Sequence, residues 1–125
     1  MIEISKSISE ELKVFNEFFR ESLDSKVNII NKVIKYIIKN KGKQVRPILC
    51  IVCSKLTGEE ANDLTYLSAS TVEILHIATL LHDDVVDDAT LRRGWPAINK
   101  IWKNKLSILV GDYMFSRSLK NISKH

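Results

Sequence analysis

Residues 74–88 read ILHIATLLHDDVVDD, an apolar run that ends in four aspartates, Asp83, Asp84, Asp87 and Asp88. The apolar part predicts a buried helix, which would bring Asp83 beside Asp87 and Asp84 beside Asp88, one turn apart. Carboxylates at that spacing repel one another unless they point into solvent or share a cation. Acid runs at helix ends are usually solvated, but the buried helix that leads into this one favours a cation site.

The residue types around this run indicate which cation and which ligand. Mg²⁺ is usually held by one or two carboxylates together with water and substrate phosphates. The run lacks the alternating acids and glycine of a calcium loop and the paired histidines of a zinc helix. Arg92 and Arg93 follow shortly after the acids, and guanidinium groups bind phosphate oxygens through two parallel hydrogen bonds. The aspartates and the arginines together predict a site for a diphosphate that Mg²⁺ bridges to the protein.

A second pair of cations stands at the start of another expected helix. Residues 42–47 read GKQVRP, where the glycine permits a tight turn and Pro47 suits the first turn of the helix that follows. Lys43 and Arg46 would therefore lie where free backbone N–H groups also favour an anion. The alternative is a solvated loop, which is the commoner outcome for cations in such segments.

Hydrophobic spacing predicts amphipathic helices over residues 4–23, 27–37, 47–56 and 59–87, and from 106 to the C-terminus. The longest is expected to be the central element, with its core side formed by Leu64, Leu67, Val72, Leu75, Ala78, Leu81 and Val85. A capping box is expected at Thr57 and Glu60, and a loop over residues 89–95. Since no strand alternation is present, the predicted fold class is all-α, an antiparallel helix bundle.

His76 would share one helix face with Glu73, Leu80, Asp83 and Asp87. A lone histidine on an apolar helix is more often a core residue than a ligand contact. Because His76 shares a face with the acids, the core interpretation is less strongly favoured over a ligand contact here.

Composition limits the remaining function classes. The 125 residues fit one domain, and 27% charged with 45% hydrophobic residues is globular rather than disordered composition. The net charge of +4 is spread along the chain without a recognition motif, so no nucleic acid partner is expected. Cys50 and Cys53 are expected to be small buried residues, and Trp95 and Trp102 packing residues. With neither a signal sequence nor a transmembrane segment expected, a soluble, cytoplasmic protein follows.

Three motifs occur in order: Gly42-Lys43-x-x-Arg46-Pro47, His76, and Asp83-Asp84-x-x-Asp87 followed by Arg92-Arg93-Gly94. Their order and spacing resemble the trans-polyprenyl diphosphate synthases. The text LLHDDVVDDATLRRG and NKLSILVGDYMFSRS is most similar to the long-chain, octaprenyl diphosphate synthase-like branch. Terpene cyclases share the aspartate motif alone, so the three motifs together make the resemblance specific. It covers nearly the whole chain and implies that residues 1–125 form the N-terminal portion of an isoprenoid synthase fold.

The resemblance also implies an activity, the head-to-tail condensation of isopentenyl diphosphate with an allylic prenyl diphosphate. Mg²⁺ held by Asp83 and Asp87, with Asp84 nearby, would bind the allylic diphosphate, which Arg92 would also hold. The residues implied to hold isopentenyl diphosphate are Lys43, Arg46, His76 and Arg93.

Product length is a further implication of the resemblance. Family members tune it with residues just before the first acid, where bulky side chains close the pocket. Ala78 and Thr79 are both small, so a medium or long polyprenyl product is expected.

The chain departs from the family pattern in two ways. Lys41 stands where glycine is usual, and Gln44 where arginine is common. The family is also much longer and carries a second aspartate-rich motif, whereas after Asp88 the only acid here is Asp112. We therefore expect half of a catalytic cleft, with exposed core that favours a homodimer or pairing with a complementary chain. The alternative is a non-catalytic partner subunit of a separate synthase, which would have little need for intact acids and arginines.

Overall fold

The computed structural model describes residues 2–124, except for the side chains of residues 2 and 5. The helices are α1 (Ile2–Ser7), α2 (Ser9–Ser22), α3 (Asn28–Lys39), α4 (Val45–Leu56), α5 (Asp63–Val86), α6 (Ile98–Ile101) and α7 (Asn104–Ser123). Two short strands, β1 (Leu91–Arg92) and β2 (Trp95–Pro96), lie between α5 and α6. The prediction of an all-α fold is confirmed, although His125, the expected end of the last helix, lies outside the described residues.

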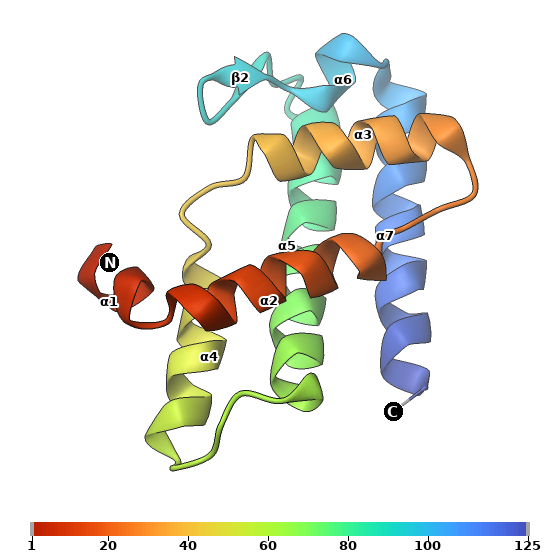
Figure 1. The fold of residues 1–125 in the computed structure, drawn as a ribbon. Coiled ribbons are helices and arrows are strands. Elements are labelled where there is room, and N and C mark those ends of the chain that lie inside the picture. Colours follow the sequence, from red (N-terminus) through yellow and green to blue (C-terminus); the bar gives the residue numbers. More distant parts are fainter. Residues whose placement is uncertain (1, 125) are drawn as a thin grey trace.

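The helices form two layers, and α5 is the middle helix of one of them (Figure 1). Figure 1 shows α4, α5 and α7 side by side in alternating directions; on one face, α2 crosses α4 and α5, and α3 crosses α5 and α7. α5 contacts α2, α4 and α7, which makes it the central element. Phe15 and Phe19 of α2 pack with Ile51 of α4 and with Ile74 and Met114 of α5 and α7 in one hydrophobic core.

A capping box fixes the start of α5, at a position other than the one predicted from the sequence. The Asn62 side chain accepts hydrogen bonds from the backbone N–H groups of Leu64 and Thr65 at 3.0 and 3.2 Å. The Thr65 hydroxyl accepts one from the Asn62 N–H at 3.2 Å. The expected cap at Thr57 and Glu60 is therefore wrong, because asparagine with threonine three residues later offers the same reciprocal bonds at the actual helix start.

The buried surface of α5 is wider than the single stripe that was predicted. Leu67, Ala78 and Leu81 are buried as expected, whereas Leu64 and Val72 are exposed. Because neighbouring helices contact α5 from several sides, the buried set also includes Tyr66, Ala69, Ser70, Glu73, Ile74, Ile77 and Asp84. A prediction from the sequence that assumes one covered helix face cannot identify residues that are buried on several faces.

The segment expected to be a plain loop contains a β-hairpin, which is a correction to that prediction. Strands β1 and β2 pair antiparallel, with Arg92 opposite Trp95. Arg93 and Gly94 form the turn, and both have positive φ, 55° and 79°, as a two-residue hairpin loop requires. The hydroxyl of Tyr36 on α3 donates to the carbonyl of Pro96 at 2.5 Å, which fastens the hairpin to the helical layers.

Two expectations about single side chains are half right. Trp102 packs edge-on against Tyr36 with ring centroids 5.4 Å apart, whereas Trp95 is half exposed. Cys50 is partly buried, but Cys53 is exposed, because it lies on the outer face of α4.

α5 is also the described helix that is long and apolar enough to cross a membrane by length and composition. Of the apolar window, 44% is buried inside the structure. A central core helix meets the same criteria.

Candidate diphosphate and metal site

The four aspartates at the end of α5 divide into three environments. Asp83 and Asp87 are exposed and stand one turn apart, with the Asp87 N–H donating to the Asp83 carbonyl at 2.8 Å. Asp84 points inward and is only 3% exposed. Asp88 accepts a hydrogen bond from the Lys100 ammonium at 2.8 Å. The predicted cluster therefore offers two free carboxylates at the surface.

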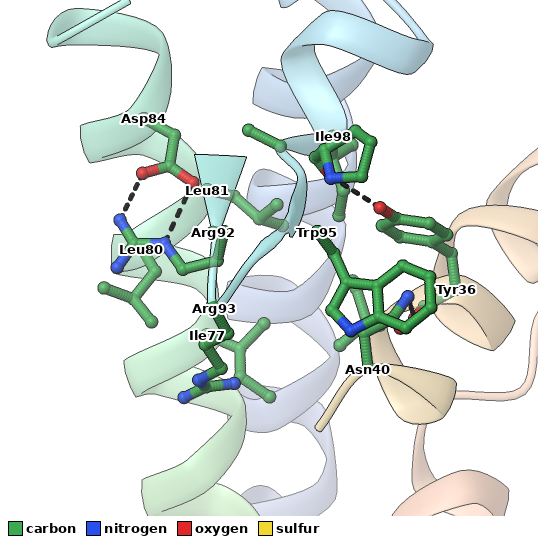
Figure 2. Close-up of a pocket in the computed structure, with 13 residues that line it drawn as sticks. Tyr36, Asn40, Ile77, Leu80, Leu81, Asp84, Arg92, Arg93, Trp95 and Ile98 are labelled. Atoms are coloured by element: carbon green, nitrogen blue, oxygen red, sulfur yellow. Dashed lines mark hydrogen bonds and ion pairs between the residues drawn. The ribbon is translucent and has the colours of Figure 1, made fainter. Parts of the chain in front are cut away.

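Arg92 on β1 is held against these acids by the buried one. Its Nε donates to Asp84 Oδ2 at 3.2 Å, and its Nη2 contacts Asp84 Oδ1 (Figure 2). The hydrogen bond to Asp84 raises the pKa of Arg92, and the charges of Asp83 and Asp87 raise it further. One edge of the Arg92 guanidinium is thus engaged by Asp84, while the charges of Asp83 and Asp87 also act on it.

The acids suit a Mg²⁺ ion that is also bound by another ligand, rather than forming a complete metal site by themselves. Among residues 2–124, no group of three or more histidine, cysteine or acidic side chains is arranged to hold a metal ion. Asp83 and Asp87 nevertheless supply two hard oxygen donors at the surface. Mg²⁺ commonly takes one or two carboxylates and completes its octahedral shell with water and phosphate oxygens. The donor set therefore suits a metal that arrives with a phosphate ligand.

A second set of cations converges from the loop between α3 and α4 and from the hairpin turn. The Arg93 guanidinium lies so close to Gly42 that a Cβ at residue 42 would stand 2.6 Å from its Cζ. Arg93, Gly42 and Lys43 line one hollow together with Asn40, Lys41 and Trp95. Positive φ is unusual for arginine, so the hairpin turn holds the Arg93 backbone in an unfavourable conformation at this place.

His76 belongs to the electrostatic surroundings of the same cations. Burial is the largest cause that lowers the pKa of His76, and the charges of Arg46, Arg93 and Arg92 lower it further. A neutral imidazole can donate from one nitrogen and accept at the other. The arginines with which the sequence grouped His76 therefore act on its imidazole through their charge.

An apolar cavity lies beside the arginines. Its lining includes Ile77 and Leu80 of α5, Tyr36 of α3 and the hairpin residues Arg92 and Arg93 (Figure 2). Positive charge thus lies beside an apolar surface, an arrangement suited to an anion that carries a hydrocarbon group.

The two residues expected to tune product length lie in different places. Ala78 has no exposed surface and packs in the hydrophobic core. Thr79 is exposed, and its hydroxyl donates to the His76 carbonyl at 2.7 Å. A role for either residue in product length stays a prediction.

Three residues near the site were not singled out from the sequence as functional. Lys100 pairs with Asp88, Tyr36 anchors the hairpin, and Glu73 is a buried acid one turn before His76. Of the three, only Glu73 could have been recognised from the sequence, since it is an acid within an apolar helical run. The other two depend on contacts between residues far apart in the chain.

Comparison with known proteins gives one consistent result. The family model for polyprenyl synthetase matches residues 27–125. An all-trans-nonaprenyl-diphosphate synthase (geranyl-diphosphate specific) from Rhodobacter capsulatus is 36% identical over 93% of this chain and 36% of its own length. Octaprenyl diphosphate synthase from Escherichia coli is 35% identical over 94% of this chain and 36% of its own length.

A solved structure has the same fold. The polyprenyl synthase from Caulobacter crescentus, crystallised with calcium and isoprenyl diphosphate, superimposes with a TM-score of 0.89 at 35% identity, covering 97% of this chain and 37% of that one. The chain spans little more than a third of the length of these relatives. The matched residues include both cation groups and the aspartate run, and the chain belongs to the polyprenyl synthetase family.

Proposed function

We propose that the chain acts in a trans-polyprenyl diphosphate synthase and contributes the contacts to both diphosphate substrates. The reaction would be the head-to-tail condensation of isopentenyl diphosphate with an allylic prenyl diphosphate. The observation that carries the proposal is the pair of exposed carboxylates, Asp83 and Asp87, beside a guanidinium group held by Asp84. The relatives named as polyprenyl synthases, and the calcium and isoprenyl diphosphate bound to one of them, support it.

Each group of residues has a defined task in this proposal. Asp83 and Asp87 would hold Mg²⁺, which when bound neutralises the diphosphate that leaves the allylic substrate. Arg92, whose free edge faces away from Asp84, would hold the same diphosphate. Because Asp84 fixes the Arg92 guanidinium before substrate arrives, Arg92 would stabilise the departing anion without reorganisation.

The second set of cations would hold isopentenyl diphosphate. Lys43 and Arg93 line one hollow, and Arg46 and Arg93 act on His76. The apolar cavity beside Arg92 and Arg93 would keep the hydrocarbon part of a prenyl ligand out of water. We propose a medium or long product, with Ala78 and Thr79 as the residues that admit it.

The proposal includes a partner and a compartment. Several apolar side chains of α7 are exposed, which favours a homodimer or association with a complementary chain. The cytoplasm is the proposed location.

A turnover assay tests the proposal. The chain is incubated with Mg²⁺, farnesyl diphosphate and labelled isopentenyl diphosphate, alone and with a chain that carries a second aspartate-rich motif. We expect little or no product from the chain alone, labelled polyprenyl diphosphate from the mixture, and loss of that product with Asp83→Ala. No product from the mixture would overturn the proposal, and full turnover by the chain alone would contradict its division of the site.

The second candidate function is that of a non-catalytic partner subunit. The exposed apolar surface of α7 favours association in either case. The same assay separates the two functions, because a product yield from the mixture that does not change with Asp83→Ala would support the non-catalytic subunit.

A further inference from the structure

Glu73 is a buried acid that the proposed function leaves without a role. It lies on α5 with 8% of its surface exposed, and its Oε2 atom is buried without a hydrogen-bond partner among the described residues. An unpaired carboxylate costs free energy when it is taken out of water, so such a group is retained in a core only when something offsets the cost.

The charges that act on Glu73 come from two other elements. Burial raises the pKa of the Glu73 carboxyl, and the charges of Arg46 in the first turn of α4 and Arg93 in the hairpin turn lower it. The same two arginines act on His76, one turn further along α5. The charges of one pair of guanidinium groups therefore act on both Glu73 and His76.

The cavity beside Glu73 leads to the loop that holds these cations. Glu73 lines it together with Lys41 and Gln44, which flank Gly42 and Lys43 in the sequence. The Arg93 guanidinium rests against Gly42 on the same loop. Lys41 of this loop lines both the cavity beside Glu73 and the cationic hollow formed with Arg93, so both adjoin the same loop.

We propose that Glu73 is a positioning residue of the second diphosphate site, whose carboxylate orients the guanidinium groups of Arg46 and Arg93 for the ligand. A guanidinium group has five N–H donors in a rigid plane, so attraction of one edge toward a carboxylate presents the other edge outward. The inference rests on the proposed function, since it assumes that a diphosphate binds here. It adds a residue with no contact to that ligand.

A positioning role and simple electrostatics predict opposite changes in anion affinity when the Glu73 carboxylate is removed. Removing a negative charge makes the site more positive, and by charge alone an anion would then bind more tightly. If Glu73 orients the arginines, its removal instead weakens anion binding, because the guanidinium groups lose their fixed direction. The sign of the change therefore identifies the role.

The test is a calorimetric titration of the 125-residue chain with inorganic diphosphate. It compares the parent with Glu73→Gln, which keeps the shape, with Glu73→Leu, which removes every acceptor, and with Glu59→Gln, the same charge change at an exposed loop position. We expect about tenfold weaker binding for Glu73→Gln, at least as large a loss for Glu73→Leu, and parental affinity for Glu59→Gln. A second readout is the Nε–Hε nuclear magnetic resonance signals of Arg46 and Arg93, which should broaden in both Glu73 variants.

Each outcome separates the inference from the proposed function. Parental or tighter binding by both Glu73 variants, with unchanged arginine signals, would overturn the positioning role while leaving the diphosphate site intact. Failure of the parent chain to bind diphosphate would overturn the proposed function and the inference with it. Should Glu73→Leu fail to fold, as judged by helical circular dichroism, Glu73→Gln alone decides the question.

Discussion

Asp84 differs from the acids on either side because it is buried and paired. Its carboxylate accepts hydrogen bonds from Arg92, while Asp83 and Asp87 remain at the surface. The sequence predicted that the acids and arginines belong together, but it assigned Arg92 only to the ligand. The ion pair depends on the hairpin, which returns Arg92 to α5, and short strands leave no periodic signal in a sequence.

Removal of Arg92 should destabilise the fold as well as weaken the site. Arg92→Ala leaves the buried Asp84 carboxylate without its partner, and we expect a loss of about 2 kcal/mol in the free energy of unfolding. The figure lies below that for fully buried pairs because the Arg92 side chain is 42% exposed. Urea denaturation measures it, with Arg20→Ala, an exposed arginine on α2, as the control. Equal stability of the parent and Arg92→Ala would contradict the pairing.

Glu73 should make stability depend on pH in a defined direction. Burial raises the pKa of its carboxyl, so the folded chain binds this proton more strongly than the unfolded chain does. Stability from this group is then fully present below the unfolded pKa and is lost as pH rises through the folded pKa. We expect Glu73→Gln to raise the melting temperature at about pH 8 and to leave it unchanged at about pH 3.5. A melting temperature that falls at pH 8 would contradict this account.

Gly111 is required where α5 and α7 approach each other closely. A Cβ at this position would collide with the ring of His82 on α5. Alanine in place of glycine within a helix normally stabilises by about 1 kcal/mol. We expect Gly111→Ala to destabilise instead, by about 1–3 kcal/mol, because the His82 ring must move. Thermal denaturation gives the sign, and a gain in stability would show that the ring has room to turn away.

At the scale of elements, the hairpin is the part that brings the arginines to the acids. Tyr36 on α3 donates to the Pro96 carbonyl, and the Ala97 N–H donates to the Thr90 carbonyl at 3.0 Å. Tyr36→Phe should cost about 1 kcal/mol and loosen the hairpin, because one anchoring hydrogen bond is lost. Hydrogen exchange at the Ala97 amide should accelerate in this variant, while the amide of Leu12 on α2 serves as the control. Unchanged exchange at Ala97 would show that the hairpin is held by other contacts.

The sequence predicted the elements that carry a long periodic signal. α5 and α7 were expected because apolar residues recur in them over many turns, and Pro47 lies in the first turn of α4 as predicted. The hairpin, α6 and the cap at Asn62 were missed. Two strands of two residues have no alternation to detect, and two capping patterns stood within a few residues of each other, between which only tertiary packing decides.

The candidate site was predictable to the extent that its residues are neighbours in sequence. The aspartate run and the arginine pair could be read directly. The approach of Arg93 to Gly42 and the cavity that Glu73 lines with Lys41 and Gln44 join residues more than 25 positions apart, so they required the fold.

At the scale of the whole molecule, one face of α7 shows apolar side chains to solvent. Ile108, Leu119 and Ile122 recur at helical spacing, and Leu119 is 67% exposed. Surfaces of this kind usually mark an interface. We expect sedimentation analysis to show a dimer or larger species, and Leu119→Glu to shift it toward the monomer without loss of helical content. A compact monomer of the parent chain would contradict the proposed interface.

The central claim is that Asp83 and Asp87 hold a diphosphate through Mg²⁺. The most direct measurement is the calorimetric affinity of the chain for farnesyl diphosphate, with and without Mg²⁺. We compare the parent with Asp83→Ala, Asp87→Ala and the control Asp88→Ala, whose carboxylate is already engaged by Lys100. We expect binding that requires Mg²⁺, falls at least about tenfold in the first two variants and is kept in the third. Binding that ignores Mg²⁺, or that survives loss of Asp83 and Asp87, would contradict the claim.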